Sequence, residues 1–242
     1  MKLLNAFLIC ATFGLASPLA AQDADALAQA FGGEWYSFDP ATADGGNCKL
    51  TLATDAVDTE GTRKVTTEDC RGPLSTAARW RIAEGQIRLS TGEAPDDVAI
   101  LGGNQFRITG EIVPDGRGVV IERATGDATG QAIRAALSKY KCYYRGFTNI
   151  CATETDLQLP TFAEESPTAV RTLVNLNVRN QPRADAAVLG VVPRETQLNV
   201  NQCLIASDGL WCRGNFSGKT GWFTRSALRD ETWPILTFVP QE

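Results

Sequence analysis

The sequence has 242 residues, carries a net charge of −5 and is 43% hydrophobic. This length and apolar content suffice for one large or two small hydrophobic cores, and they exclude the compositional classes of disordered chains. The acidic balance argues against nucleic acid as a partner, because phosphate binding requires a basic face.

The absence of histidine excludes several kinds of catalytic site. The chain has no Ser-His-Asp or Cys-His arrangement, no histidine metal ligand and no side chain that ordinarily titrates near neutral pH. Its acidic residues are scattered over polar turns, and no pattern selects a pair for hydrolysis. We therefore expect no catalytic residues, no metal site and no cofactor, and we expect the protein not to be an enzyme.

Residues 1–21 have the pattern of a signal peptide. Lys2 supplies a charged start, residues 3–15 form an apolar core, and small residues precede a cleavage site before Gln22. The apolar run is too short to span a membrane, and no later run approaches the length needed. We expect export, to the periplasm of a Gram-negative bacterium or into the medium, and no membrane span after cleavage.

Cleavage would remove Cys10 and leave six cysteines in three sequential pairs. Each pair is centred on residues with the character of a turn, and residues that face each other across a hairpin have the Cα separation a disulfide needs. The pattern predicts three disulfides, in an oxidising compartment. They are Cys48–Cys70, Cys142–Cys151 and Cys203–Cys212.

Residues 22–125 read as a small antiparallel β-barrel that follows a short helix-compatible stretch. Apolar and polar residues alternate in 48–52 and 106–112, and Glu84-Gly85 marks a hairpin turn. Roughly seven or eight short strands at regular spacing favour a closed barrel, which leaves no open edge.

This barrel segment resembles the bacterial metalloprotease-inhibitor family, whose barrel also occurs in outer-membrane lipoproteins. The resemblance implies a secreted protease as partner, reached by a free N-terminal segment that would begin near Gln22, although Asp23 and Asp25 differ from the small, neutral start of the family. The matching residues are Gly33, Trp35, Cys48, Leu50, Leu52, Cys70, Trp80, Gly85, Ile87 and Leu89. A G-x-W start also occurs in lipocalin-like barrels, where the tryptophan plugs the barrel floor, and we expect the same structural role for Trp35.

Residues 126–156 form a helix and disulfide-loop segment. Residues 131–140 predict an amphipathic helix that packs on the barrel, with Asp127 or Thr129 as its N-cap. The aromatic residues that follow the helix, up to Phe147, are interpreted as local core beside a disulfide loop or, alternatively, as an exposed patch. Residues 157–169, with two prolines and no periodicity, read as a linker.

Residues 170–230 carry the most specific sequence pattern of the chain and predict a C-terminal SH3-like barrel. Together with the N-terminal barrel, this makes the expected fold class mainly β. Leu176 and Val178 point to one face of a strand, and Asn177 and Arg179 to the other. This segment is similar to the bacterial SH3-like (SH3b) family. The matching residues are Leu176, Asn177, Val178, Arg179, Pro182, the run 188–193, Leu198, Val200, Trp211, the run 218–222 and Leu228.

Two positions depart from the SH3b pattern. Glu195 stands where the family usually turns on glycine, and Gly214 stands where a strand valine is usual. Glycine within a strand predicts a bulge or a close backbone approach.

The SH3b resemblance implies binding of short peptides, often those of the cell wall. The groove would lie between the loop after Arg179 and the hairpin turn at residues 207–210. Candidate ligand-binding residues are Arg179, Asp208, Trp211 and Trp222. Trp222 is also expected in the core and Trp211 on an exposed surface, while Arg179 has the alternative role of pairing with an acid such as Asp185.

The apolar tail, residues 231–242, is expected to pack on the barrel or the middle segment, with occupation of the groove as the alternative. The sequence thus predicts an exported, non-enzymatic protein whose partner is a peptide or a peptidoglycan stem peptide. A periplasmic protease inhibitor and an SH3b-targeted cell-wall enzyme are the alternatives.

Overall fold

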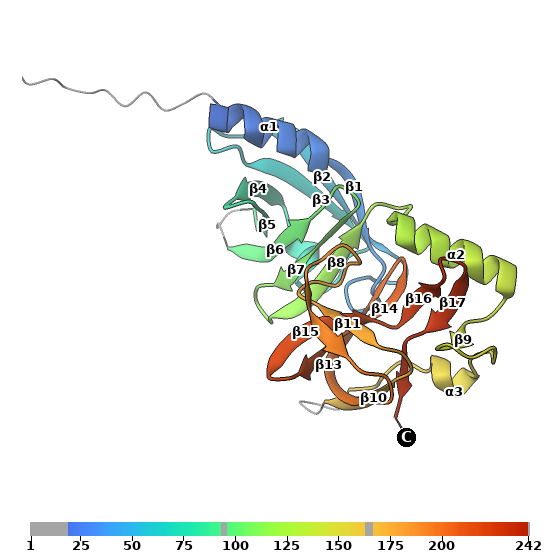
Figure 1. The fold of residues 1–242 in the computed structure, drawn as a ribbon. Helices are drawn as coiled ribbons and strands as arrows, with labels where there is room; N and C mark the ends of the chain where they lie inside the picture. The colour runs from blue at the N-terminus through green and yellow to red at the C-terminus, as the bar shows by residue number, and fades with distance from the viewer. Residues whose placement is uncertain (1–18, 93–95, 163–166, 242) are drawn as a thin grey trace, which may run out of the picture.

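The computed structural model describes residues 19–92, 96–162 and 167–241, which fold into two β units that lie against each other (Figure 1). The mainly β fold class is confirmed. Most of the predicted signal peptide falls on residues 1–18, outside the described residues. Within the described ranges, no helix is long and apolar enough to cross a membrane.

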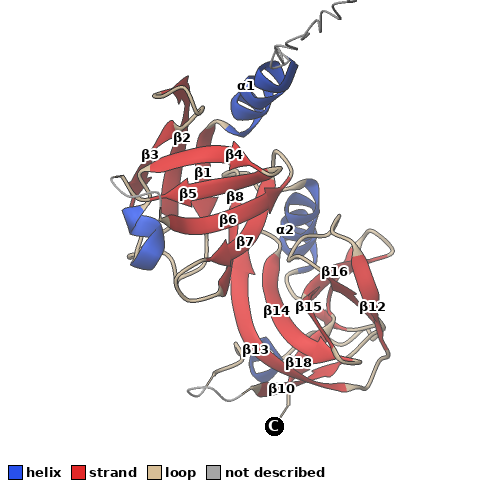
Figure 2. Cartoon of the chain, turned by 90° about the vertical axis from the view of Figure 1, so that its left-hand side faces the viewer, coloured by secondary structure: helices blue, strands red, loops and turns tan. Residues whose placement is uncertain are grey.

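The first unit is a closed barrel, as the strand spacing predicts. Each strand pairs antiparallel with the next in chain order, and the last returns to the first through Tyr36 and Glu122. Figure 2 shows the barrel beside the second unit, with the first helix at its far end. Its elements are α1 (Leu19–Phe31), β1 (Gly33–Ser37), β2 (Cys48–Ala56), β3 (Arg63–Glu68), the 3-10 helix η1 (Gly72–Thr76), β4 (Arg79–Ala83), β5 (Gln86–Ser90), β6 (Asp97–Gly103), β7 (Arg107–Ile112) and β8 (Arg117–Glu122).

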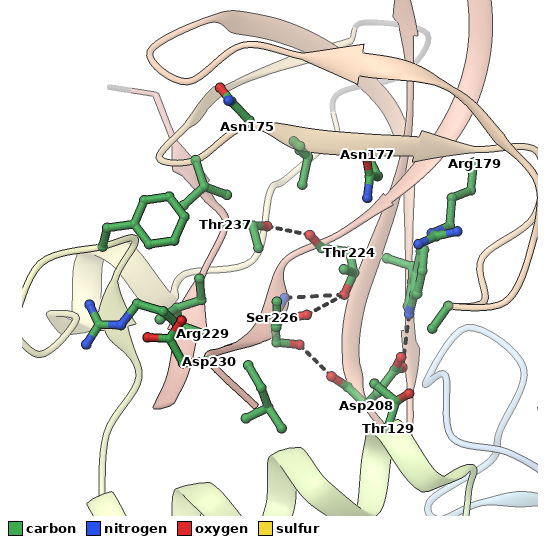
Figure 3. A pocket seen from close by; sticks show the side chains of 18 residues that line it. Thr129, Asn175, Asn177, Arg179, Asp208, Thr224, Ser226, Arg229, Asp230 and Thr237 are labelled. Atoms are coloured by element: carbon green, nitrogen blue, oxygen red, sulfur yellow. Dashed lines mark hydrogen bonds between the residues drawn. The ribbon is translucent and has the colours of Figure 1, made fainter. Parts of the chain in front are cut away.

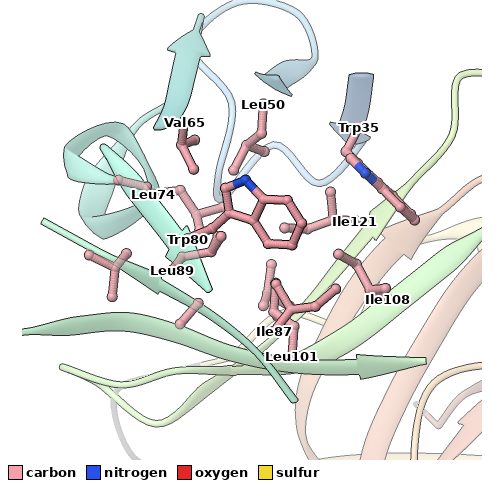
Figure 4. Packing of buried hydrophobic residues seen from close by; sticks show 14 of the residues in the cluster. Trp35, Leu50, Val65, Leu74, Trp80, Ile87, Leu89, Leu101, Ile108 and Ile121 are labelled. Carbon is pink, nitrogen blue, oxygen red and sulfur yellow. The ribbon is translucent and has the colours of Figure 1, made fainter. Parts of the chain in front are cut away.

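Side chains fill the interior of this barrel (Figure 4). The two indoles, Trp35 and Trp80, are fully buried among branched aliphatic residues. Each indole N–H donates to a backbone carbonyl, that of Trp35 to Phe31 at 2.7 Å and that of Trp80 to Ala53 at 2.9 Å. Because the polar edge of each ring is satisfied, its large apolar body can be buried at little cost. The structural role predicted for Trp35 is confirmed.

Helix α1 is docked on the barrel from Asp25 onward. Asp25 pairs with Arg63 at 2.6 Å, and Ala28 is buried in the barrel core. Arg123 lies over the Trp35 ring at 4.0 Å and donates to the carbonyls of Ala30 and Gly32 near the helix C-terminus. This docked helix differs from the free segment that the inhibitor resemblance implies.

The middle segment carries the predicted helix and connects the two units. Helix α2 (Ala128–Tyr140) begins at Asp127, whose side chain accepts from the Gly130 amide at 2.8 Å, so Asp127 and not Thr129 is the cap. Ile133 and Ala136 are buried on its inner face, which packs mainly against residues 226–236 of the C-terminal unit, so the expected packing on the barrel is wrong. Strand β9 (Tyr144–Arg145) and the short helix α3 (Glu154–Leu157) follow.

The C-terminal unit is a seven-stranded sheet with a second, three-stranded sheet beside it. The strand order is β12-β11-β15-β14-β13-β10-β18 in the first and β16-β17-β9 in the second. The strands are β10 (Thr168–Thr172), β11 (Leu176–Arg179), β12 (Val188–Val192), β13 (Gln197–Ala206), β14 (Gly209–Phe216), β15 (Lys219–Thr224), β16 (Ser226–Arg229), β17 (Trp233–Leu236) and β18 (Phe238–Pro240).

The apolar tail is part of these sheets, which confirms that it packs rather than floats. Strand β17 pairs with β16 and, in parallel, with β9 of the middle segment, while β18 pairs with β10. Phe238 is fully buried and meets Phe223 edge to face at 5.3 Å. The tail thereby completes the core of the C-terminal unit.

Both departures from the SH3b pattern have a geometric explanation. Glu195 adopts φ +58°, the left-handed conformation that glycine ordinarily supplies. A Cβ on Gly214 would lie 2.6 Å from the Asn199 carbonyl oxygen, and the opposing strand shifts register between Val200 and Gln202. The predicted bulge is confirmed.

All three predicted disulfides are present. The Cα–Cα distances are 4.3 Å for Cys48–Cys70, 5.7 Å for Cys142–Cys151 and 4.1 Å for Cys203–Cys212. The last pair faces directly across the β13–β14 hairpin, as its symmetric spacing predicts.

The two β units share a buried apolar contact. Val120 of the barrel packs in one cluster with Trp211, Trp222 and two aliphatic residues of β13. Beside it, the Gln202 side-chain amide both donates to and accepts from the Gly118 backbone at 3.0 Å. A Cβ on Gly118 would lie 2.5 Å from the Trp222 ring, so glycine lets the strand approach the indole.

Candidate functional site

A groove of about 390 Å³ opens on the C-terminal unit (Figure 3). One wall is β11 with the loop that follows it, and the opposite wall is β16 with β17. The β13–β14 turn closes one end, Phe147 of the disulfide loop lies at its rim, and Thr129 reaches it from α2. The lining residues are Thr129, Phe147, Val174, Asn175, Leu176, Asn177, Arg179, Ala184, Asp208, Trp211, Thr224, Ser226, Ala227, Leu228, Arg229, Asp230, Ile235 and Thr237.

The alternation of β11 decides which side chains face this groove. Leu176 and Val178 are buried in the core of the unit, while Asn177 is exposed and Arg179 is half-buried at the groove. The two-residue period of a strand therefore presents an amide and a guanidinium side by side to a ligand. This is the arrangement that the sequence predicts.

Arg179 has no carboxylate partner within 4.0 Å among the described residues. Its Nη1 donates to the Ala186 carbonyl at 2.7 Å, while Asp185, the acid considered as its partner, pairs with Arg183 at 2.7 Å instead. Burial lowers the pKa of Arg179, and the nearby charge of Asp185 opposes this only in part. A partly desolvated guanidinium without an ion pair is suited to bind an anionic group of a ligand.

A second guanidinium, that of Arg229, lies toward the other end of the groove (Figure 3). It lies over the rings of Tyr144 and Trp233, at 6.0 Å and 5.8 Å from their centroids, and donates to the Thr148 carbonyl at 3.2 Å. It too has no ion pair with a carboxylate of the described chain. The groove therefore carries a cation toward each end.

The middle of the groove is neutral and polar. The hydroxyl groups of Thr224, Ser226 and Thr237 donate to backbone carbonyls, of Ser226, Asp208 and Thr224 respectively (Figure 3). Because these donors are already used, the polar groups left for a ligand include the Asn177 amide and the two arginines, with the exposed carboxylate of Asp230 beside Arg229. This arrangement suits an extended polar ligand with anionic groups.

Trp211 lines the groove but is only 1% exposed, so its predicted exposure is wrong. Its ring packs in the cluster between the two units, and its Nε1 donates to the Asp208 carboxylate at 2.9 Å. The N-terminal barrel covers the face of Trp211 that was expected to be exposed to solvent. A direct role for Trp211 in ligand binding stays a prediction.

Trp222 is 7% exposed and lies outside the groove lining. Its predicted place in a core is confirmed, although this core is the contact with the N-terminal barrel. The structure therefore brings Arg179, Asp208 and Trp211 together at one groove and separates Trp222 from them.

Asp208 belongs to a buried ionic cluster between the two units. Arg107 of β7 is fully buried and lies 2.8 Å from Asp208 and 2.7 Å from Glu122. Glu122 also accepts from the backbone amide and hydroxyl of Ser207, both at 2.6 Å. Burial lowers the pKa of Arg107, but the Asp208 and Glu122 carboxylates outweigh that effect and raise it. The charged cluster holds the β13–β14 turn against the barrel.

Sequence reasoning did not single out Arg107 or Glu122. Each stands in a short strand of a predicted barrel, where a charged residue ordinarily faces solvent. Only the placement of the second unit over this end of the barrel buries them. The signal available was weak, because β7 and β8 carry other charged residues, Glu111 and Arg117, that give Arg107 and Glu122 no distinction in the sequence.

The tail forms a wall of the groove and does not fill it. Ile235 of β17 and Thr237, between β17 and β18, are among the lining residues, and both strands are paired in the sheets. The alternative in which the tail occupies the groove is therefore wrong for the described residues.

Comparison with known families assigns the C-terminal unit. Residues 174–228 match the family described as Bacterial SH3 domain. Residues 174–228 of this unit are therefore a bacterial SH3 domain, as their motifs predict. The match stops short of helix α2, the disulfide loop and the tail, so the groove is built from the SH3 domain together with residues outside it.

Whole-chain comparisons add little. Two solved structures are similar to the chain at a TM-score of 0.26: "NMR solution structure of lysostaphin", with 9% identity, and "The antimicrobial peptidase lysostaphin from Staphylococcus simulans", with 10%. Each alignment covers 85% of this chain and 80% of the other. The search of curated proteins gave no match.

Proposed function

We propose that this protein is an exported binding protein that recognises peptide or peptidoglycan ligands in the groove of its SH3 domain. The observation that carries the proposal is the polar face of β11, where Asn177 and the unpaired Arg179 line an open groove. Bacterial SH3 domains bind peptidoglycan or peptides, and stem peptides carry carboxylates that a guanidinium binds well.

Three disulfides support a place outside the cytoplasm, because such bonds form and persist in oxidising compartments. We propose the periplasm or the medium as that place. Export through a signal peptide, cleaved before Gln22, belongs to the same proposal. Mass spectrometry of the protein recovered from the host envelope measures the mature N-terminus, and retention of residues 1–21 would contradict it.

The proposed action is binding without catalysis. The chain contains no histidine, and all six cysteines outside residues 1–18 are in disulfides. In the groove, Asp208 is already engaged by Arg107 and Trp211, which ill suits it to transfer protons. A zymogram with purified cell walls tests this, and a cleared band would favour the cell-wall enzyme alternative.

Cosedimentation with purified peptidoglycan tests the proposed ligand. We expect the wild-type chain to pellet with peptidoglycan and the Arg179→Gln variant to bind about tenfold more weakly, because one charge-assisted contact is lost. Arg183→Gln is the matched control: Arg183 lies in the loop after β11 but does not line the groove. Equal binding by both variants would contradict the assignment of the groove.

The protease-inhibitor alternative has its own test. The closed barrel is the feature that favours it, while the docking of α1 through Asp25 and Ala28 gives the N-terminal segment less freedom to enter a protease cleft. Titration of a secreted zinc protease with excess purified protein decides the matter. Unchanged protease activity would end the alternative.

A further inference from the structure

A second cavity, of about 290 Å³, adjoins the groove. Phe147 lines both, so this ring stands on the ridge between them. A hydrogen bond also joins them, because the Asn175 side-chain Oδ1 at the groove accepts from the backbone amide of Arg194 at the cavity, at 3.0 Å. The two hollows therefore lie next to each other on one face of the molecule.

This second cavity is cationic, although the chain as a whole is acidic. Its lining includes Arg145, Arg171 and Arg194 but a single acid, Glu195. Glu195 pairs closely with Arg171, at 2.6 Å, and only distantly with Arg194, at 4.0 Å. Arg145 is paired outside the lining, with Asp156 at 3.1 Å. The guanidinium of Arg194, 65% exposed, is therefore the one most available to a ligand.

The ridge between the two hollows is held in a fixed position. Gly146 adopts φ +54° and packs so closely on Leu173 that a Cβ would lie 2.9 Å from the Leu173 carbonyl oxygen. Its amide donates to the Leu236 carbonyl at 3.1 Å, and the Cys142–Cys151 disulfide closes the loop. Phe147 is nevertheless 61% exposed. A large apolar side chain on a fixed loop, between two polar hollows, is a good contact for a bound chain.

We propose that this cavity is a second subsite for the peptide bound in the groove, and that it takes a carboxylate of that peptide. The ligand would be an acidic peptide that crosses Phe147, with one anionic group near Arg179 or Arg229 and a further one at Arg194. The inference rests on the proposed function, but most of this subsite lies outside residues 174–228. It would extend recognition beyond the SH3 domain itself.

Calorimetry with the full chain tests the proposal. The probes are a peptidoglycan stem peptide with free carboxylates and the same peptide with those carboxylates amidated. We expect Arg194→Gln to weaken binding of the free acid about tenfold and to leave binding of the amidated peptide within about twofold. Phe147→Ser should weaken both a few-fold, because the ring contacts the chain and not its charges.

Arg71→Gln is the matched control for charge. Arg71 is also exposed and lies 3.9 Å from one acid, Asp44, but it is on the N-terminal barrel. The Arg71→Gln variant should bind both peptides as tightly as the wild type does. If Arg194→Gln also matches the wild type while Arg179→Gln is impaired, the second subsite is overturned and the proposed function stands. If the wild type binds neither peptide, both are overturned.

Discussion

Asp208 connects the ligand groove to the contact between the two β units. Its carboxylate accepts from Trp211 in the groove and pairs with the buried Arg107 of the barrel. Without the Asp208 carboxylate, the buried Arg107 guanidinium loses one carboxylate partner and the Trp211 indole N–H loses its acceptor. Substitution of such a residue lowers the free energy of unfolding even where no ligand is bound.

We therefore expect Asp208→Ala to lower the free energy of unfolding by about 3–5 kcal/mol, as removal of one partner of a buried ion pair does. Urea denaturation followed by circular dichroism measures the loss. The control is Asp44→Ala, since Asp44 is exposed and its ion pair with Arg71 is long, at 3.9 Å. This substitution should lower the free energy of unfolding by no more than about 0.5 kcal/mol. A similar small cost at Asp208 would contradict the account of the cluster.

Single residues also show where sequence reasoning succeeds. Asn177 and Arg179 were predicted to share the open face of a strand, because alternation alone determines it. The exposure of Trp211 could not be predicted in this way. Its burial depends on contact with the N-terminal barrel, which is distant in the sequence, and no local sequence pattern indicates that contact.

At the level of elements, the tail strand β18 completes the SH3 domain from outside the matched residues. It pairs with β10 through residues 170–172, and its Phe238 is buried against Phe223. The tail also supplies the side of the groove that carries Ile235 and Thr237. Core stability and the shape of the groove therefore depend on the same segment.

Phe238→Ala should lower the free energy of unfolding by about 3–5 kcal/mol, the usual cost of removing a buried aromatic ring. Thermal denaturation monitored by near-ultraviolet circular dichroism checks it. Phe147→Ala serves as its control because that ring is mostly exposed, and it should change stability little. Equal effects of the two substitutions would show that β18 is not part of the core.

Most elements could be predicted because their signals are local. Alternation identified strands such as β2 and β7, and the paired spacing of the cysteines identified all three disulfides. The parallel pairing of β9 with β17 was beyond such reasoning. It joins segments about ninety residues apart through backbone hydrogen bonds, which no side-chain pattern encodes.

For the whole molecule, the contact between barrel and SH3 domain is the main feature. It combines an apolar cluster around Trp222 with the fully buried Arg107 ion pairs. Interfaces that bury charge and aromatic rings together couple the folding of their two sides. The arrangement of the two units could not be predicted, because the SH3b resemblance describes one unit without its neighbour.

We expect calorimetry of the wild-type chain to show one cooperative unfolding transition. Gly118→Val should separate it into two, because the added side chain would clash with the Trp222 ring. Gly46→Val is the control, since a Cβ on Gly46 has no atom within 4 Å. Two transitions in the wild type would contradict a coupled interface.

If the SH3 groove binds the ligand, a titration followed by NMR locates the contact residue by residue. The measurement records backbone amide shifts of the labelled full chain as a peptidoglycan stem peptide is added. We predict that the largest changes occur at Asn177, Arg179 and Ser226, which line the groove. Changes confined to the exposed residues of β12, such as Val191, or the absence of any change at millimolar peptide, would contradict binding in the groove.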